Sequence, residues 1–136
     1  MSVEANRAMA LRFLELMSNL DFKPMFELMS EDSVWTVAGK QETFPQAGPQ
    51  PKHIRAQMFD AFITVLRSLT FDIVSTTAEA NRVVVEFTAR GEAYGGQIYE
   101  NEFLSLFTFR DGKIVGVYEH CDQQSVFAFE RSLQSA

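Results

Sequence analysis

The fold is decided by one stretch near the C-terminus, Gln97–Asp122, which reads QIYENEFLSLFTFRDGKIVGVYEHCD. Two apolar runs flank Asp111-Gly112, a dipeptide suited to the positive φ angles of a two-residue hairpin turn. Tyr99–Phe109 is therefore predicted to pair antiparallel with Lys113–Asp122. At its far end the predicted hairpin carries three polar residues, Glu119, His120 and Asp122. This polar end of the hairpin is therefore a candidate functional site.

Helical patterns dominate the N-terminal half. Residues 3–20 repeat apolar side chains every three or four positions, and Ser2 is a candidate N-cap. Asp21 is a candidate cap for a second, short helix, and Pro51 starts a third. Between the second and third helices, Ser33–Ala38 is rich in β-branched and aromatic residues, which predicts a strand.

The C-terminal half predicts a meander of antiparallel strands. Its four segments are Thr70–Glu79, Arg82–Tyr94, Gln97–Phe109 and Lys113–Asp122. Each connection is short enough for a hairpin. Three helices followed by a meander predict an α+β fold, with the helices packed on one face of a strongly bent, mostly antiparallel sheet. At 136 residues the chain is expected to form a single domain, 1–136.

The third strand of this meander is apolar on both faces. Phe103 and Phe107 share one parity of the strand, and Leu104 and Leu106 share the other. Helices of the same chain cover only one face of such a sheet. A second copy of the chain, in a two-fold homodimer, is therefore predicted to cover the other face.

Composition excludes several classes of partner. Twelve basic and eighteen acidic residues give a net charge of −6, which disfavours a nucleic acid partner. No apolar run approaches the roughly 20 residues of a membrane helix. Because Cys121 is the only cysteine and no signal-peptide pattern is present, the protein is expected to be cytoplasmic.

Metal and cofactor motifs are missing from the sequence. His53, His120 and Cys121 form no recognised metal-ligand spacing, so no metal site is predicted. Glycine-rich phosphate loops and serine or cysteine nucleophile motifs are likewise absent. The enzymatic chemistry left open is therefore cofactor-free.

Four motifs carry a family resemblance. They are Glu31–Trp35, Tyr99–Phe103, Arg110–Val115 and Glu119–Asp122. With the order of elements, they make the chain resemble the SnoaL-like branch of the nuclear transport factor 2-like (NTF2-like) superfamily, which includes ketosteroid isomerases, polyketide cyclases and limonene epoxide hydrolase. The resemblance implies a cone-shaped half-barrel whose helices close one end around a deep pocket, and a dimer formed through the sheet.

The resemblance singles out Asp122 as a candidate catalytic residue, and strand alternation adds His120, which stands where the family usually has Tyr. Asp122 falls where cyclases of this type carry a pocket Asp that acts as acid or base, and strict alternation puts His120 on the same strand face. A histidine there can tune or relay a proton. The alternatives are that Asp122 caps a terminal helix over Gln123–Leu133 and that His120 is an interface residue. The same alternation points Glu119 to the opposite face.

Further candidates concern ligand binding. Tyr99 and Asn101 share one strand face and are predicted to orient or polarise a substrate oxygen. The alternative is that they satisfy neighbouring strands or the dimer contact. Glu86 is a polar anchor if its face lines the cone, or a solvated charge if it does not. The expected apolar walls are Trp35, Met58, Phe62 and Phe103, with Trp35 alternatively a core residue.

These features predict a cofactor-independent acid/base enzyme of the isomerase, cyclase, dehydratase or hydrolase type. Its substrate is expected to be a small, apolar, oxygen-bearing molecule held in the cone. The alternative is a non-catalytic ligand-binding or dimeric interaction module of the same fold.

Overall fold

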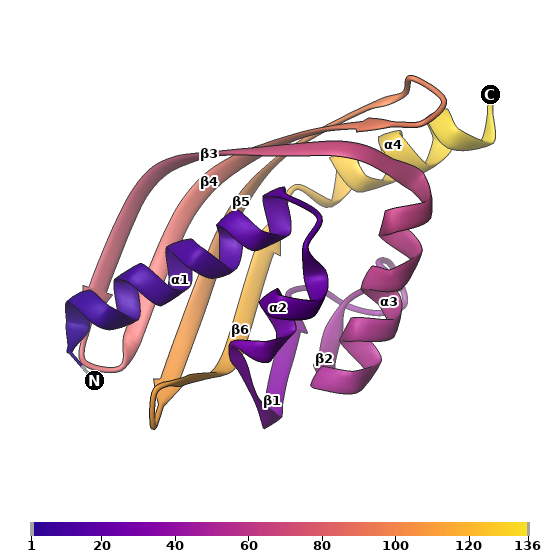
Figure 1. The fold of residues 1–136 in the computed structure, drawn as a ribbon. Helices are drawn as coiled ribbons and strands as arrows, with labels where there is room; N and C mark the ends of the chain where they lie inside the picture. Colours follow the sequence, from indigo (N-terminus) through magenta and orange to yellow (C-terminus); the bar gives the residue numbers. More distant parts are fainter. Residues whose placement is uncertain (1, 136) are drawn as a thin grey trace.

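The computed structural model describes residues 2–135 and has an α+β fold (Figure 1). In chain order the elements are α1 Val3–Ser18, α2 Phe22–Glu27, β1 Met29–Val37, β2 Gly48–Pro51, α3 Lys52–Val65, β3 Leu66–Glu79, β4 Arg82–Ala93, β5 Ile98–Arg110, β6 Lys113–Cys121 and α4 Gln123–Gln134. The predicted fold class is confirmed.

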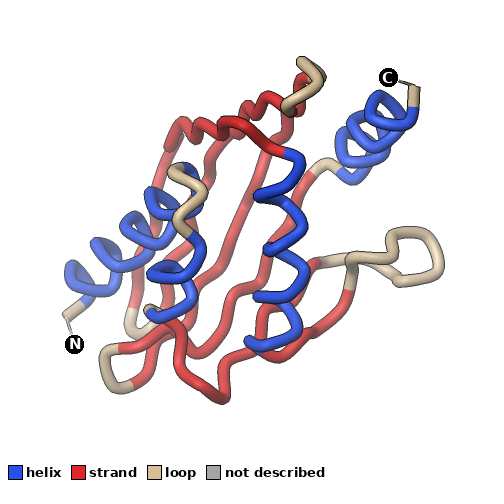
Figure 2. The backbone as a smooth tube through the Cα atoms, turned by 45° about the vertical axis from the view of Figure 1, so that its right-hand side comes forward, coloured by secondary structure: helices blue, strands red, loops and turns tan. Residues whose placement is uncertain are grey.

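The six strands form one curved, open sheet in the order β2-β1-β6-β5-β4-β3. Only β1 and β6 run parallel, and all other neighbours are antiparallel. A register shift between Ile73 and Ser75 interrupts β3, and bulges of this kind increase bending of a strand. Figures 1 and 2 show α1, α2 and α3 on the concave face and α4 beyond the end of β6.

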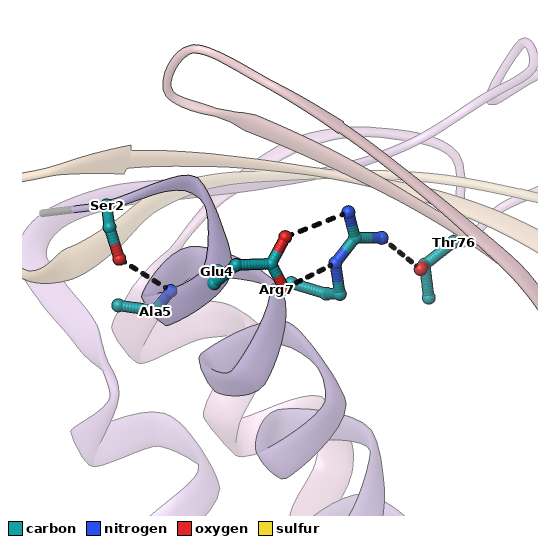
Figure 3. A network of polar contacts seen from close by, with 5 residues as sticks. All are labelled: Ser2, Glu4, Ala5, Arg7 and Thr76. Atoms are coloured by element: carbon teal, nitrogen blue, oxygen red, sulfur yellow. Dashed lines mark hydrogen bonds and ion pairs between the residues drawn. The ribbon is translucent and has the colours of Figure 1, made fainter.

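The start of α1 is fixed by the predicted cap. Ser2 Oγ accepts a hydrogen bond from the Ala5 backbone N–H at 3.0 Å (Figure 3). One turn later, Arg7 pairs with Glu4 and donates to the Thr76 hydroxyl on β3. These contacts join the first helix to the far edge of the sheet.

The β5–β6 hairpin has the predicted turn. Asp111 and Gly112 have φ angles of 51° and 77°, the left-handed values that a two-residue hairpin turn requires. Across the hairpin, Phe107 pairs with Val117 and Ser105 pairs with Glu119. This register sets which side chains of β6 face the helices.

The segment Gly39–Gln50 is rich in Gly, Pro and Gln, a composition typical of loops, yet it contains most of β2. This short edge strand pairs antiparallel with β1, with Trp35 opposite Gln50. Glycine and proline are unusual within strands except at edges, which explains why sequence patterns do not reveal β2. The strand leads directly into α3, which begins at Lys52.

A core of packed aromatic rings lies beside the inner face of the sheet. Trp35 is 1% exposed, and its ring lies 5.4 Å from that of Phe13 and 4.9 Å from that of Phe59. Phe13 in turn meets Phe107 edge-on at 5.3 Å.

Within residues 2–135, no helix is both long and apolar enough to cross a membrane.

Candidate functional site

A cavity of about 330 Å³ lies between α3, α4 and the inner face of the sheet, at the end away from the β3–β4 turn. Its walls are largely apolar and include five residues predicted to contact ligand, namely Trp35, Met58, Phe62, Tyr99 and Phe103. A shallower groove of about 380 Å³ lies at the opposite end, beside Ser2 and Asn81. The acidic residue of that groove, Asp111, is exposed, so the deeper, largely apolar cavity is the better candidate site.

The inner face of β6 supplies an acidic side chain to the cavity. Glu119 and Cys121 both line it, two residues apart on the same strand face. Glu119 pairs with Val37 of β1 and Ser105 of β5, so a strand lies on each side of it. The other acidic lining residue, Glu130 of α4, is exposed to solvent.

Glu119 is poised to gain or lose a proton near neutrality. Burial raises the pKa of its carboxyl from about 4.5 to about 7, because a charge is poorly solvated in an apolar cavity. The positive charge of Arg55 and the indole N–H of Trp35 oppose this rise. Trp35 Nε1 makes no hydrogen bond of normal geometry with residues 2–135, and its effect on the pKa of Glu119 is smaller than that of Arg55. Both protonation states of Glu119 are therefore accessible.

Arg55 is a buried cation at the edge of the cavity. The residue is 2% exposed, and its guanidinium donates from Nη2 to the backbone carbonyls of Trp35 at 2.9 Å and Gly48 at 3.2 Å. Nη1 donates to the carbonyl of Gln46 at 3.4 Å. Arg55 thus ties α3 to the loop before it and supplies positive charge near Glu119. Burial lowers the pKa of Arg55, and the charge of Glu119 opposes that change.

Tyr99 contributes a hydroxyl to the same cavity. Its ring packs 5.2 Å from that of Phe129 on α4, and its Oη accepts a hydrogen bond from Asn101 Nδ2 at 2.7 Å. Burial raises the pKa of Tyr99 above its usual range, so the phenol stays protonated. Asn101 itself is 5% exposed and lies behind Tyr99 rather than on the cavity wall.

Cys121 is a neutral thiol in this environment. Burial and the charge of Glu119 raise its pKa to about 12, although a hydrogen bond from Asn101 opposes the rise. Because the thiolate is the nucleophilic form of cysteine, this environment suppresses attack by Cys121. Glu119, with a pKa of about 7, is the better placed of the two to change protonation state near neutral pH.

The two residues predicted to be catalytic lie elsewhere. Asp122 is the N-cap of α4, where its carboxylate accepts from the Gln124 N–H and the Ser125 hydroxyl, both at 3.0 Å. His120 is exposed on the outer face of the sheet and stacks on Tyr118 at 5.0 Å. The structure therefore does not bring Asp122 and His120 together in the cavity.

Glu86 also lies outside the cavity. It is exposed on β4, opposite Leu104 of β5, and its carboxylate accepts from the Ser75 hydroxyl at 3.0 Å. The strand face that carries Glu86 is thus the outer one. Of the predicted polar contacts, Tyr99 alone lines the cavity, with Asn101 behind it.

Sequence reasoning did not select Glu119 and Arg55. A signal for Glu119 exists, because it is a charged residue between the apolar residues Val117 and Cys121 of the same strand face. Arg55 gives no such signal, since a basic residue near the start of a helix looks solvated in the sequence. Among residues 2–135, no three His, Cys, Asp or Glu side chains are grouped as metal ligands.

Comparisons with known proteins agree with this architecture. PrhC from Penicillium brasilianum has a TM-score of 0.87 at 18% identity, over 98% of this chain and 90% of that protein. BvnE pinacolase from Penicillium brevicompactum has a TM-score of 0.85 at 20% identity, over 98% of this chain and 93% of the other. A nuclear transport factor 2-like protein of unknown function from Burkholderia pseudomallei has a TM-score of 0.77 at 19% identity, over 95% and 98%.

Sequence comparison gives one clear assignment. No curated protein matches the chain. The model of the SnoaL-like domain matches residues 10–117, well over half of the sequence. The chain therefore belongs to the SnoaL-like domain family.

Proposed function

We propose that this protein is a cofactor-independent acid/base enzyme that acts on a small, apolar, oxygen-bearing molecule in the cavity. The observation that carries the proposal is Glu119, a carboxyl inside an apolar cavity with a pKa of about 7. A group with that pKa is near the optimum for proton transfer at neutral pH, and one positioned acid or base typically contributes about 10²- to 10⁴-fold in rate.

In this proposal Glu119 takes the proton-transfer role that the sequence suggested for Asp122 and His120. Arg55 and Trp35 favour its ionised form, and Tyr99 donates to a substrate oxygen. The apolar walls, including Phe103, hold the substrate body. The volume of about 330 Å³ is near the lower end of the range for small-molecule sites, about 300 to 1,000 Å³.

A rearrangement or isomerisation is the reaction type that we favour. BvnE, a protein of similar fold, is named a pinacolase. That name supports an intramolecular rearrangement as the reaction type. Such a reaction needs a proton donor or acceptor and a polarised oxygen, both of which the cavity supplies.

The single cysteine supports a cytoplasmic location.

The test uses 5-nitrobenzisoxazole, an apolar probe whose ring opens when a base removes its ring C–H proton. As that proton moves to Glu119, the N–O bond breaks and a coloured cyano-nitrophenolate forms. We expect turnover to rise with pH and to reach half its maximum near pH 7, because the carboxylate is the active form. Glu119→Gln should lower the rate about 10²-fold or more.

Glu86→Gln is the matched control, because it removes one negative charge from the outer face. It should leave the rate and the pH profile unchanged. Equal rates for wild type and Glu119→Gln would contradict the proposal. Tight binding of the probe without any turnover would favour the non-catalytic binding module instead.

We also propose that the protein is a homodimer formed through the outer sheet face. Leu104 and Tyr118 are 48% and 44% exposed there, with Val34 nearby on the same sheet face. Exposed apolar side chains gathered on one face are typical of association surfaces. Tyr118→Glu should convert dimer to monomer in analytical ultracentrifugation, whereas Glu86→Gln should not. A wild-type protein that sediments as a monomer at micromolar concentration would refute this assembly.

A further inference from the structure

The hydrogen bonds of Asn101 determine whether the Tyr99 hydroxyl donates to a ligand or accepts from it. Asn101 Oδ1 accepts from two backbone N–H groups, that of Glu102 at 2.7 Å and that of Asp122 at 3.0 Å. Backbone N–H groups only donate, so they identify the oxygen end of the Asn101 amide. The nitrogen end must then face Tyr99.

That orientation determines the polarity of the Tyr99 hydroxyl. Asn101 Nδ2 donates to Tyr99 Oη at 2.7 Å, so the phenolic oxygen is used as an acceptor. A hydroxyl has one proton, and no acceptor for it is found among residues 2–135. Tyr99 lines the cavity, so its free proton is available to a bound molecule.

We propose that Asn101 is a positioning residue that makes Tyr99 a hydrogen-bond donor toward the cavity, so that the site selects ligands bearing a carbonyl, ether or epoxide oxygen. This inference rests on the proposed function in one respect, that the cavity binds a ligand. It adds that the ligand must offer a hydrogen-bond acceptor to Tyr99, and it assigns this requirement to Asn101, which lies outside the cavity wall.

The arrangement is rigid, because each partner is held from another element. Asn101 lies on β5 and is 5% exposed, the Asp122 N–H comes from the junction of β6 and α4, and Phe129 of α4 packs on the Tyr99 ring. Reversing the Tyr99 hydroxyl would leave Asn101 Nδ2 facing a donor. Buried donors without acceptors are costly, so the donor orientation of Tyr99 is strongly preferred.

The test compares two probes of the same shape. 2-Acetylnaphthalene carries a carbonyl oxygen, and 2-isopropenylnaphthalene has a CH₂ group in its place. Dissociation constants measured by fluorescence at pH 8 should show that wild type prefers the ketone by about 3- to 10-fold, as expected for one neutral hydrogen bond. The alkene reports the apolar fit alone and serves as the internal control for folding.

Two variants then separate Tyr99 from Asn101. Tyr99→Phe removes the hydroxyl, and Asn101→Asp replaces the donor behind Tyr99 with an acceptor, which turns the phenolic proton away from the cavity. Both should abolish the ketone preference while alkene binding is kept. Asn81→Asp, in the β3–β4 turn, is the matched control and should keep the preference.

The possible failures are distinguishable. Equal affinity of wild type for the two probes, or a ketone preference that survives Asn101→Asp, would overturn the inference while leaving the proposed function intact. If Asn101→Asp also loses the alkene because it does not fold, Tyr99→Phe decides, and a retained preference there overturns the inference. Failure of wild type to bind either probe would remove the ligand site itself, and the proposed function with it.

Discussion

The two faces of β6 give neighbouring residues opposite environments. Glu119 points into the cone, where burial raises its pKa to about 7. His120, the next residue, is exposed on the outer face and stacks on Tyr118. Histidine is the side chain that ordinarily titrates near neutrality, yet here the cavity gives that property to a glutamate. Environment, more than residue type, determines which group can exchange protons in the site.

The largest expected difference between the faces is in stability, and β5 offers a matched pair of positions. Phe107 is fully buried on the inner face, whereas Leu106 is half-buried on the outer face. Phe107→Ala should lower the free energy of unfolding by about 3 to 5 kcal/mol, because it leaves a cavity in the core. Leu106→Ala should cost less than half as much. Urea denaturation measures both, and equal losses would contradict the assignment of inner and outer faces.

The second prediction concerns pH. Because the folded pKa of Glu119 is about 7 and its ordinary value is 4.5, the folded state holds a proton between these values that the unfolded state has released. Stability should therefore fall as pH rises from 4.5 to 7, by about 3 kcal/mol at most. The loss is complete above pH 7. Unfolding measured from pH 4.5 to 8 checks this.

Glu119→Gln should remove most of that pH dependence, since the amide does not titrate in this range. Glu86→Gln should retain it, because Glu86 is exposed on the outer face. An unchanged pH dependence in Glu119→Gln would show that some other group carries the linkage.

A smaller effect is expected at the end of β6. Asp122→Ala removes the side-chain cap of α4 and should cost about 0.5 to 2 kcal/mol. Turnover of 5-nitrobenzisoxazole should stay the same, because the carboxylate of Asp122 points to the first turn of α4. A large loss of turnover in a folded Asp122→Ala protein would restore the catalytic role first predicted for this residue.

The smallest effect is expected for His120. His120→Ala should change the free energy of unfolding by no more than about 0.5 kcal/mol, measured at concentrations where the chain is monomeric, because the ring is exposed. Its turnover of the probe should match wild type. A rate loss comparable to that of Glu119→Gln would place His120 in the mechanism.

Most of the fold follows from local patterns in the sequence. Asp111-Gly112 predicts the turn that joins β5 and β6, and Ser2 predicts the cap that begins α1. These signals work because turns and caps are determined by a few adjacent residues. The edge strand β2 escaped prediction because its glycine and prolines are characteristic of loops.

The site depended on information that no single segment contains. Alternation correctly divides β6 into two rows, one with Glu119 and Cys121 and one with Tyr118 and His120. It does not say which row faces the helices, because neighbouring β5 is apolar on both faces. The buried Arg55 likewise depends on carbonyls of a distant loop, a tertiary arrangement that helical periodicity does not encode.

The most direct test of the account is the titration of Glu119. Carboxyl ¹³C chemical shifts of glutamate side chains, followed by NMR from pH 3 to 9, should contain one resonance with a midpoint near pH 7 that disappears in Glu119→Gln and persists in Glu86→Gln. That result would establish a proton-exchanging carboxyl in the cavity. A Glu119 resonance that titrates near 4.5 would show a solvated carboxylate and contradict the proposed acid/base role.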